Sequence, residues 1–374
     1  MTDTVQAPGR TRFVRYYDGL ENPRPDEGEL IKKMADALFG NNKWALKKYG
    51  RGIRDAHAKG LAFLHGSLEV YDGLDQEYRQ GLFAEPKKKY DIIARLSSTA
   101  GAIRTDQARG IRGLGIKVIR VDGDRALPGD TRKNHDFVLV THREFPFKDA
   151  QAYLKRGMRL ARLLVHLPDR ALILAGDVLS RIQPILRVFG QSLPASLLLF
   201  TEPNVHILGM TFFSSAPFRY GDYVAKWCVA PLSKSVTQFE GQLVPSDAGP
   251  DAFRDMVASF FRTNSAGYEF RVQLLTDPIK MPIEDATVEW PEKDSPYVGV
   301  AKITFPDQNT YSAKRRAFAD DELEFNPWHG LAAHRPLGSI NRLKRLVYEA
   351  STDFRHRANR LARREPESIQ DLPE

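Results

Sequence analysis

Short strand-like segments recur along the chain, and they limit the fold more than any other feature of the sequence. Between residues 61 and 121, three segments alternate apolar and polar side chains or form short apolar runs, with Gly and Asp at their ends. Five further segments of this kind lie at residues 135–145, 204–215, 221–232, 268–276 and 297–305. Because most of them are joined by hairpin-like turns, the pattern predicts an antiparallel eight-stranded β-barrel.

Helical patterns interrupt and follow the strands, so we expect an α+β protein, a barrel with helical insertions and C-terminal helices. We predict one folded unit in three parts: an N-terminal arm at residues 1–50, a barrel core at 51–312 and a C-terminal helical segment at 313–374. The basic, Leu-rich stretch at 153–164 predicts an amphipathic helix packed on the barrel. Contact with a membrane surface or a fatty-acid carboxylate is the alternative.

Charge and cysteine content narrow the function classes. The formal net charge of +8 predicts an anionic partner, which could be nucleic acid, a membrane surface, phosphate or a carboxylated cofactor. The sequence carries no nucleic-acid-binding motif, so we expect no nucleic-acid partner. The sequence also has no apolar run of membrane-spanning length and no secretory signal pattern, and we expect a cytoplasmic protein. With Cys228 as the single cysteine, redox chemistry would need a cofactor.

One motif precedes the first strand. Residues 54–60 are Arg54-Asp-Ala-His57-Ala-Lys-Gly, and Leu-Glu-Val follows at 68–70. Taken alone, His57 has an ordinary structural explanation, because a lone histidine is more often part of a core than of a site. The segment, however, resembles the distal segment of haem catalases, R-x-x-H-A-K-G followed by F-E-V. The resemblance implies a b-type haem with its iron, and His57 above the metal as catalytic acid and base.

A second match lies in the next two strands. Residues 94–99 are similar to the catalase R-F-S-T segment, and residues 106–113 are similar to D-T-x-R-D-P-R-G. The resemblance implies that Arg54 and Arg95 contact the haem propionates and that Ser97 bonds to the distal histidine. Arginine suits this role because its planar fork pairs with carboxylates. Arg112 is either a further cofactor contact or a residue that fixes a turn.

A third match lies in the C-terminal segment. Phe325-Asn-Pro, Arg345-Leu-Val-Tyr348 and the later His-Arg pair that ends at Arg357 are similar to the catalase F-x-P, R-L-F-x-Y and T-x-x-H-R. The resemblance implies that Tyr348 ligates the iron and that Arg357 contacts a propionate. The family arginine stands four residues before the tyrosine; here Lys344 has that position and Arg345 stands three before, and either can share a helix face with the tyrosine. His329 and His334 are the alternative iron ligands.

The distal side departs from the family. Where catalases have G-N-N-T-P with a peroxide-binding asparagine, this chain has Thr141 and His142, and we predict that these two residues assist His57 in catalysis. The sequence therefore predicts a haem-dependent peroxidase that acts on hydrogen peroxide or organic hydroperoxides, with a small organic electron donor.

Two alternatives stay open beside that prediction. One is a fatty-acid hydroperoxide isomerase or lyase similar to allene oxide synthase, and the other is a non-enzymatic haem-binding protein. The resemblance extends from about residue 54 to 357, and the chain lacks the long arms of typical catalases, so a homodimer stays an open alternative.

Overall fold

A closed antiparallel β-barrel forms the centre of the computed structural model, which describes residues 12–98 and 101–374. The hydrogen-bonded order is β5-β4-β3-β2-β1-β9-β8-β7, and a β5–β7 pairing closes this ring of eight strands, with β6 attached to β7. The strands are β1 Lys59–Val70, β2 Lys89–Ser98, β3 Arg112–Val118, β4 His135–Val140, β5 Phe212–Phe213, β6 Phe218–Tyr220, β7 Tyr223–Pro231, β8 Ala266–Leu274 and β9 Val298–Phe305. The predicted fold class and barrel are thus confirmed.

Alternation along the strands separates the barrel interior from its outer face. On β2, Ala94 and Leu96 point inward and join the main hydrophobic core, as does Ile116 of β3. The side chains between them, Arg95 and Ser97, therefore face outward. Strands β2 and β3 thus present polar groups on the outer face of a fully packed barrel.

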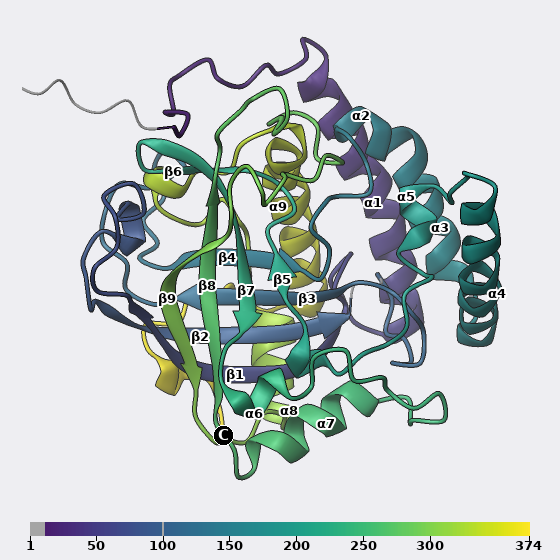
Figure 1. Cartoon of the computed structure of the whole chain (residues 1–374). Helices are drawn as coiled ribbons and strands as arrows, with labels where there is room; N and C mark the ends of the chain where they lie inside the picture. Colours follow the sequence, from purple (N-terminus) through teal and green to yellow (C-terminus); the bar gives the residue numbers. More distant parts are fainter. Residues whose placement is uncertain (1–11, 99–100) are drawn as a thin grey trace, which may run out of the picture.

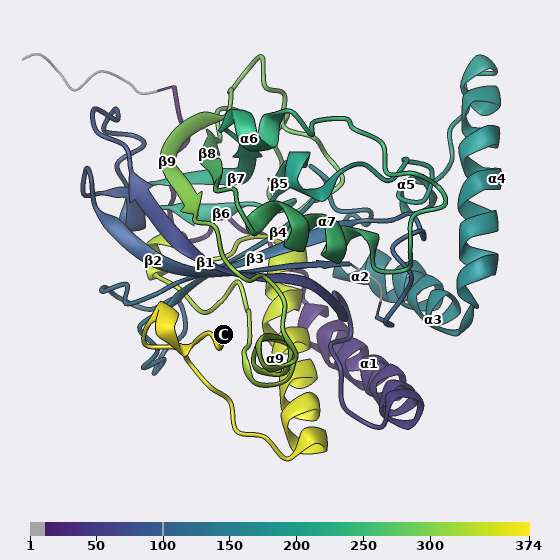
Figure 2. The same ribbon diagram turned by 90° about the horizontal axis from the view of Figure 1, so that it is seen from below.

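Helices cover part of that outer face. Figures 1 and 2 show α9 lying across strands β1–β4, with α1 beside it. The helices are α1 Glu27–Tyr49, α2 Ala150–Ala152, α3 Met158–His166, α4 Asp169–Val188, α5 Ala195–Leu198, α6 Lys234–Thr237, α7 Ala252–Phe261, α8 Ala313–Arg316 and α9 Ser339–Asn359. Shorter turns are η1 Gly81–Phe83, η3 Ile207–Gly209, η5 Ala332–His334 and η6 Ile369–Asp371 (3₁₀), and η2 Tyr153–Gly157 and η4 Ala317–Glu322 (π).

Helix α9 is held at its start and along one side. Arg342 forms ion pairs with Glu21, Glu27 and Glu284 at 2.5, 2.5 and 2.8 Å. Apolar side chains of α1 pack against Leu343 of α9 in a separate small core. These contacts fix the face of α9 that is turned toward the barrel.

Three elements differ from their predicted form. Helix α1 lies within the predicted arm, and its apolar residues pack on α9. The strand predicted at 135–145 ends at Val140, because the chain turns away and the Phe145 N–H donates to the Ala286 carbonyl at 2.9 Å. The segment predicted at 204–215 contributes only the two residues of β5, since the 3₁₀ turn Ile207–Gly209 takes up its middle.

Candidate functional site

The turn before β1 positions His57 in a strained conformation. Its backbone φ is +56°, a left-handed value that non-glycine residues seldom adopt. The ring packs on β3 at Gly113, where a Cβ would come within 2.3 Å of the His57 Nδ1 atom. Arg95 donates to the His57 carbonyl at 2.8 Å, so the turn is also held from β2. Packing and hydrogen bonding together fix this imidazole in one orientation.

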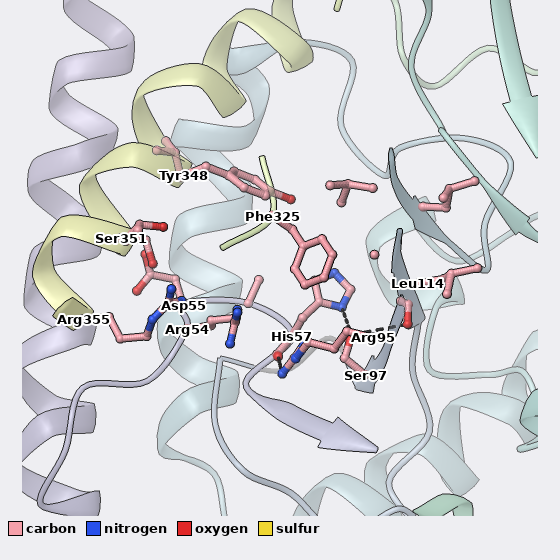
Figure 3. Close-up of a pocket in the computed structure, with 17 residues that line it drawn as sticks. Arg54, Asp55, His57, Arg95, Ser97, Leu114, Phe325, Tyr348, Ser351 and Arg355 are labelled. Atoms are coloured by element: carbon pink, nitrogen blue, oxygen red, sulfur yellow. Dashed lines mark hydrogen bonds between the residues drawn. The ribbon is translucent and has the colours of Figure 1, made fainter. Parts of the chain in front are cut away.

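Hydrogen bonds assign the tautomer of His57. The Ser97 hydroxyl donates to the Gly113 carbonyl at 3.4 Å, so its oxygen is free to accept from the His57 Nδ1–H at 3.1 Å. Burial, with help from Arg95 and Arg54, lowers the pKa of His57 to about 3, which keeps the ring neutral near pH 7. The second ring nitrogen then carries a free lone pair, and Figure 3 shows it turned toward the pocket. His57 can act as a base there.

Three arginines line one end of the same pocket. Arg54 donates to the backbone carbonyls of Asp320, Ala319 and Leu323 at 2.7, 2.8 and 2.6 Å. Arg95 pairs with the Asp320 carboxylate at 2.8 Å, and Arg54 lies 3.6 Å from the same oxygen.

Arg355 of α9, 2% exposed, donates to the Leu323 carbonyl at 3.2 Å. Its Nε has no hydrogen-bond partner among the described residues. Arg54 and Arg95 thus share the Asp320 carboxylate, whereas Arg355 forms no ion pair among the described residues.

Asp55 lies in the same end of the pocket, and the sequence patterns did not single it out. Figure 3 shows it between Arg54, Ser351 and Arg355. Neither of its carboxylate oxygens has a hydrogen-bond partner within the described part of the chain. Burial raises the pKa of Asp55 to about 7, although Ser351 and Arg355 act in the other direction. This carboxyl group therefore offsets little of the arginine charge below neutral pH.

Tyr348 of α9 faces His57 across the pocket (Figure 3). Burial, together with the neighbouring Tyr153, raises the pKa of Tyr348 to about 12. Neither of the two cations that precede Tyr348 in the motif pairs with its hydroxyl group in this structure. Arg345 is exposed and lies over the Trp328 ring at 5.6 Å, and the Lys344 Nζ donates to the Asn341 Oδ1 at 3.1 Å.

The pocket itself has a cavity volume of about 100 Å³. Its residues come from the His57 turn, strands β2 to β4, the segment before α9, and α9 itself. They are Arg54, Asp55, Ala56, His57, Arg95, Ser97, Gly113, Leu114, Gly115, Val138, Leu139, Phe325, Val347, Tyr348, Ser351, Thr352 and Arg355. Apart from the groups described above, its walls are largely apolar.

Helix geometry explains which C-terminal arginine reaches the pocket. Arg355 follows Tyr348 by seven residues, about two turns, and so shares its face. Arg357 follows it by nine, about two and a half turns, and is exposed on the other side. The structure therefore places Arg355 where the sequence patterns had suggested Arg357, and helical spacing from Tyr348 was the signal that could have found it.

Three other predicted site residues lie outside the pocket lining. Arg112 donates to the Ala108 carbonyl and Asn204 at 3.0 and 2.9 Å, and its guanidinium lies over the Phe253 ring, so it fixes a turn. Thr141 accepts from the Arg112 N–H at 3.1 Å. His142 points toward Glu202, 4.0 Å away.

The alternative iron ligands are also elsewhere. His334 is buried in the barrel interior against Phe83 and Trp227, and its Nε2 accepts from the Leu82 N–H at 2.9 Å. His329 is buried in a group of charges that we name the Lys117 cluster. The members of this cluster are Lys117, Asp136, Glu324, His329 and Glu365.

The Lys117 cluster could be taken for a metal site. Glu324, His329 and Glu365 offer ligand atoms within 4.8 Å of one another. The Lys117 ammonium, however, lies 2.7 Å from Asp136 and 3.2 Å from Glu365. Arg132 and Arg363 lie 3.4 and 3.6 Å from Glu324. Cations already neutralise these carboxylates, so the cluster is a structural ion-pair network.

Comparisons with known proteins agree with this architecture. No family model matches the chain. A catalase from Neisseria gonorrhoeae is 22% identical over 317 residues, which are 80% of this chain and 60% of that catalase. Catalase A from Saccharomyces cerevisiae superposes on the whole chain with a TM-score of 0.59 at 17% identity, over 75% of its own length. A fungal catalase gives 0.58 at 17% identity, over 73% of its length. The chain has a catalase-like fold.

The predicted resemblance to catalases is thereby confirmed, although this catalase-like chain spans only about three fifths of the Neisseria protein that it matches. The pocket between β2, β3 and α9 is where the matched motifs converge: the His57 turn, the Arg95 strand and the Tyr348 helix. Within the described residues, no helix of this fold is both long and apolar enough to cross a bilayer.

Proposed function

We propose that this catalase-like chain binds a b-type haem in the pocket and acts as a peroxidase on hydroperoxides. The observation that carries the proposal is the surplus of buried guanidinium charge. Arg54 and Arg95 share the carboxylate of Asp320, Arg355 has no ion-pair partner among the described residues, and buried charges are stable only when they are paired. A planar cofactor with two carboxylates would supply the missing anions.

The other residues of the pocket also fit this group. Glycines stand opposite Arg95 and Ser97 in the strand register, at Gly115 and Gly113. Any side chain at Gly113 would collide with the His57 ring, and a Cβ at Gly115 would lie 3.0 Å from Phe325. The open space therefore depends on these two glycines. Tyr348 would hold the iron, and the three arginines would hold the propionates.

The bound haem would supply redox chemistry at an iron with a phenolate ligand, the ligand type of catalase itself. A metal cation lowers the pKa of the group that it binds, so iron would ionise a phenol that burial otherwise keeps protonated. No arginine of α9 needs to approach the oxygen of Tyr348 for this to happen.

His57 would move the proton. Its free ring nitrogen accepts the proton of the hydroperoxide O–H, and the same nitrogen then returns that proton to the departing oxygen, which leaves as an alcohol or as water. Ser97 keeps the lone pair on the pocket side by accepting from the Nδ1–H. With a pKa of about 3, the ring is available as a base throughout the neutral range.

The walls of the pocket favour an organic hydroperoxide. Val138, Phe325 and Val347 contribute apolar surface. Thr141 and His142 lie outside the lining, so His57 and Ser97 are the polar groups on the distal side. The same apolar walls favour a second candidate, a fatty-acid hydroperoxide isomerase or lyase, which would need no electron donor.

Absorption spectra and turnover test the proposal together. The purified protein with haem should show a Soret band that Tyr348→Phe shifts or abolishes. Tyr153→Phe, which removes the hydroxyl of the neighbouring buried tyrosine, should leave the band in place. The haem-loaded protein should consume cumene hydroperoxide with an added electron donor, and His57→Gln should lower kcat by about a hundredfold or more.

Three results separate the alternatives. A normal Soret band in Tyr348→Phe would contradict the ligand assignment. Turnover without a donor would favour the isomerase. Haem bound tightly with no turnover of any hydroperoxide would favour a non-enzymatic haem protein.

A further inference from the structure

Helix α4 presents an apolar stripe to solvent. Leu174, Val178, Ile182 and Ile185 recur at intervals of four, four and three residues, so they lie on one side of the helix. Their exposed fractions run from 39% to 65%, and Val188 and Phe189 at the end of the helix are 82% and 74% exposed. A contiguous apolar surface of this kind marks an interaction site in a folded protein.

The opposite side of α4 is attached to the rest of the molecule. Asp169 and Asp177 pair with Arg104 and Arg109, from the segment before β3, at 2.7 and 3.0 Å. Gly176 is buried against the backbone of Phe200, where a Cβ would lie 3.2 Å from the carbonyl oxygen. Figures 1 and 2 show α4 standing at one edge of the molecule beside α3. The helix is therefore held with its apolar stripe facing outward.

Positive charge surrounds the stripe. Residues 150–199 hold seven Lys and Arg against two Asp, a surplus of five out of the net +8 of the chain. The two aspartates are those paired with Arg104 and Arg109, so they do not neutralise this surplus. The exposed arginines of this surface are Arg159, Arg162, Arg170, Arg181 and Arg187.

The combination of positive charge and apolar surface indicates which partner binds to α4. A second copy of the chain would bring arginines against arginines, and such repulsion opposes a symmetric contact. An anionic bilayer surface attracts the arginines and accepts the apolar side chains below its headgroups. We propose that α4 and the exposed face of α3 form a docking surface for an anionic lipid bilayer, on which α4 lies parallel to the membrane plane.

The dimensions agree with this orientation. The 20 residues of α4 extend for about 30 Å, long enough to place several apolar side chains in the interface at once. Leu163 of α3, 55% exposed, extends the apolar surface toward Arg159 and Arg162. This proposal does not depend on haem or on the proposed peroxidase activity, because none of these residues lines the pocket.

Vesicle sedimentation with the full-length protein tests the docking surface. Binding should be strong to vesicles that contain phosphatidylglycerol, weak to vesicles of phosphatidylcholine alone, and reduced by high salt. Replacing two arginines, Arg170→Gln with Arg181→Gln, should weaken binding by roughly 30-fold, since each basic residue at an anionic surface contributes about fivefold. The matched control is Lys32→Gln with Lys33→Gln, two exposed lysines of α1, which should bind as the wild type does.

A second pair of substitutions tests the contribution of the apolar stripe to vesicle binding. Leu174→Ser with Ile185→Ser should weaken vesicle binding by about tenfold or more. Ile279→Ser, at a position 91% exposed on a different part of the chain, should not. All three positions of these variants face solvent, so thermal unfolding should stay close to the wild type. Phe189→Trp adds a direct readout, because brominated lipid should quench its fluorescence.

Several outcomes would overturn the proposal. One is an absence of binding to anionic vesicles, and another is binding that the α4 variants leave unchanged. A third is a concentration-dependent dimer in light scattering that Leu174→Ser with Ile185→Ser dissociates, which would make a second copy the occupant. Unquenched Phe189→Trp fluorescence on bound vesicles would show that another surface docks.

Discussion

Two groups of buried charge lie a few residues apart along the outer face of β3, and they are balanced differently. In the Lys117 cluster, Lys117 contacts Asp136 and Glu365, while Arg132 and Arg363 contact Glu324. In the pocket, Arg54 and Arg95 share one carboxylate, Arg355 has no ion-pair partner among the described residues, and Asp55 has a raised pKa. Both groups carry a charge cost of burial, but only the first is compensated by the chain itself.

The difference separates a structural network from a binding site. Burial opposes the charge of Lys117, yet Asp136 and Glu365 together raise its pKa, so the cation is retained within the fold. For Arg54, by contrast, burial and the nearby Arg355 and Arg95 lower the pKa well below its usual value. This imbalance is the physical basis on which we propose a dicarboxylate cofactor for the pocket.

The largest expected effect comes from breaking the balanced cluster. Lys117→Met would leave Asp136, which is fully buried, without its cation, and should lower the free energy of unfolding by about 3–5 kcal/mol. Chemical denaturation of the haem-free protein measures this change. Lys280→Met, which breaks a solvent-exposed pair with Asp294, should cost less than about 1 kcal/mol.

A double variant tests whether the charges of Lys117 and Asp136 are coupled. Lys117→Met combined with Asp136→Asn should recover part of the loss, because both buried charges disappear together. Equal stability of the single and double variants would show that the two charges are not coupled.

Arg355→Met should weaken haem binding without lowering the stability of the haem-free protein. It removes a cation that the fold does not compensate, so the haem-free protein should be as stable as the wild type or more stable. Haem affinity should fall about tenfold to a hundredfold, the value of a charge-assisted hydrogen bond. Titration with haem, followed by absorbance, measures the affinity.

Arg357→Met is the matched control for that change, since the side chain is exposed two residues further along the same helix. Equal losses of affinity in Arg355→Met and Arg357→Met would refute the assignment of Arg355 to the pocket.

The sequence predicted the parts of this molecule that depend on local patterns. The barrel follows from alternation along the strands, and the motif matches brought Arg54, His57, Arg95 and Tyr348 to one pocket. Strand register accounts for Ser97, which pairs with Gly113 and so faces the same way as Arg95.

Long-range packing determines the features of the pocket that the sequence did not predict. Thr141 and His142 leave the pocket because the chain after β4 bonds to the distant segment at Ala286, which no local pattern signals. Asp55 was missed because an acidic residue inside a basic motif is ordinary on a surface turn. Its importance comes from α9, which covers it from nearly 300 residues away in the sequence.

Asp55→Asn should change how stability depends on pH. The folded protein holds the Asp55 proton up to about pH 7, whereas an unfolded chain releases it near pH 4. The wild type therefore loses stability as pH rises through this window, and the asparagine variant should not. At about pH 8, the haem-free variant should be more stable by roughly 2 kcal/mol, a figure reduced for water in the pocket. Thermal unfolding at several pH values measures the difference, and a constant gap across the window would contradict the raised pKa.

The smallest effect is expected from Ser97→Ala. Ser97 is a positioning residue: it accepts from the His57 Nδ1–H and touches neither arginine charge nor Tyr348. Its loss should lower kcat for an organic hydroperoxide by roughly fivefold, the value of one neutral hydrogen bond, while haem affinity stays unchanged. The pH profile of kcat should keep its shape, because exchange between the two neutral tautomers of His57 takes up no proton. Ser98→Ala provides the control, since this neighbouring hydroxyl is buried without a hydrogen-bond partner among the described residues and lies outside the pocket lining. If Ser97→Ala weakened haem binding as much as Arg355→Met does, the separation between proton-moving and carboxylate-binding residues would fail.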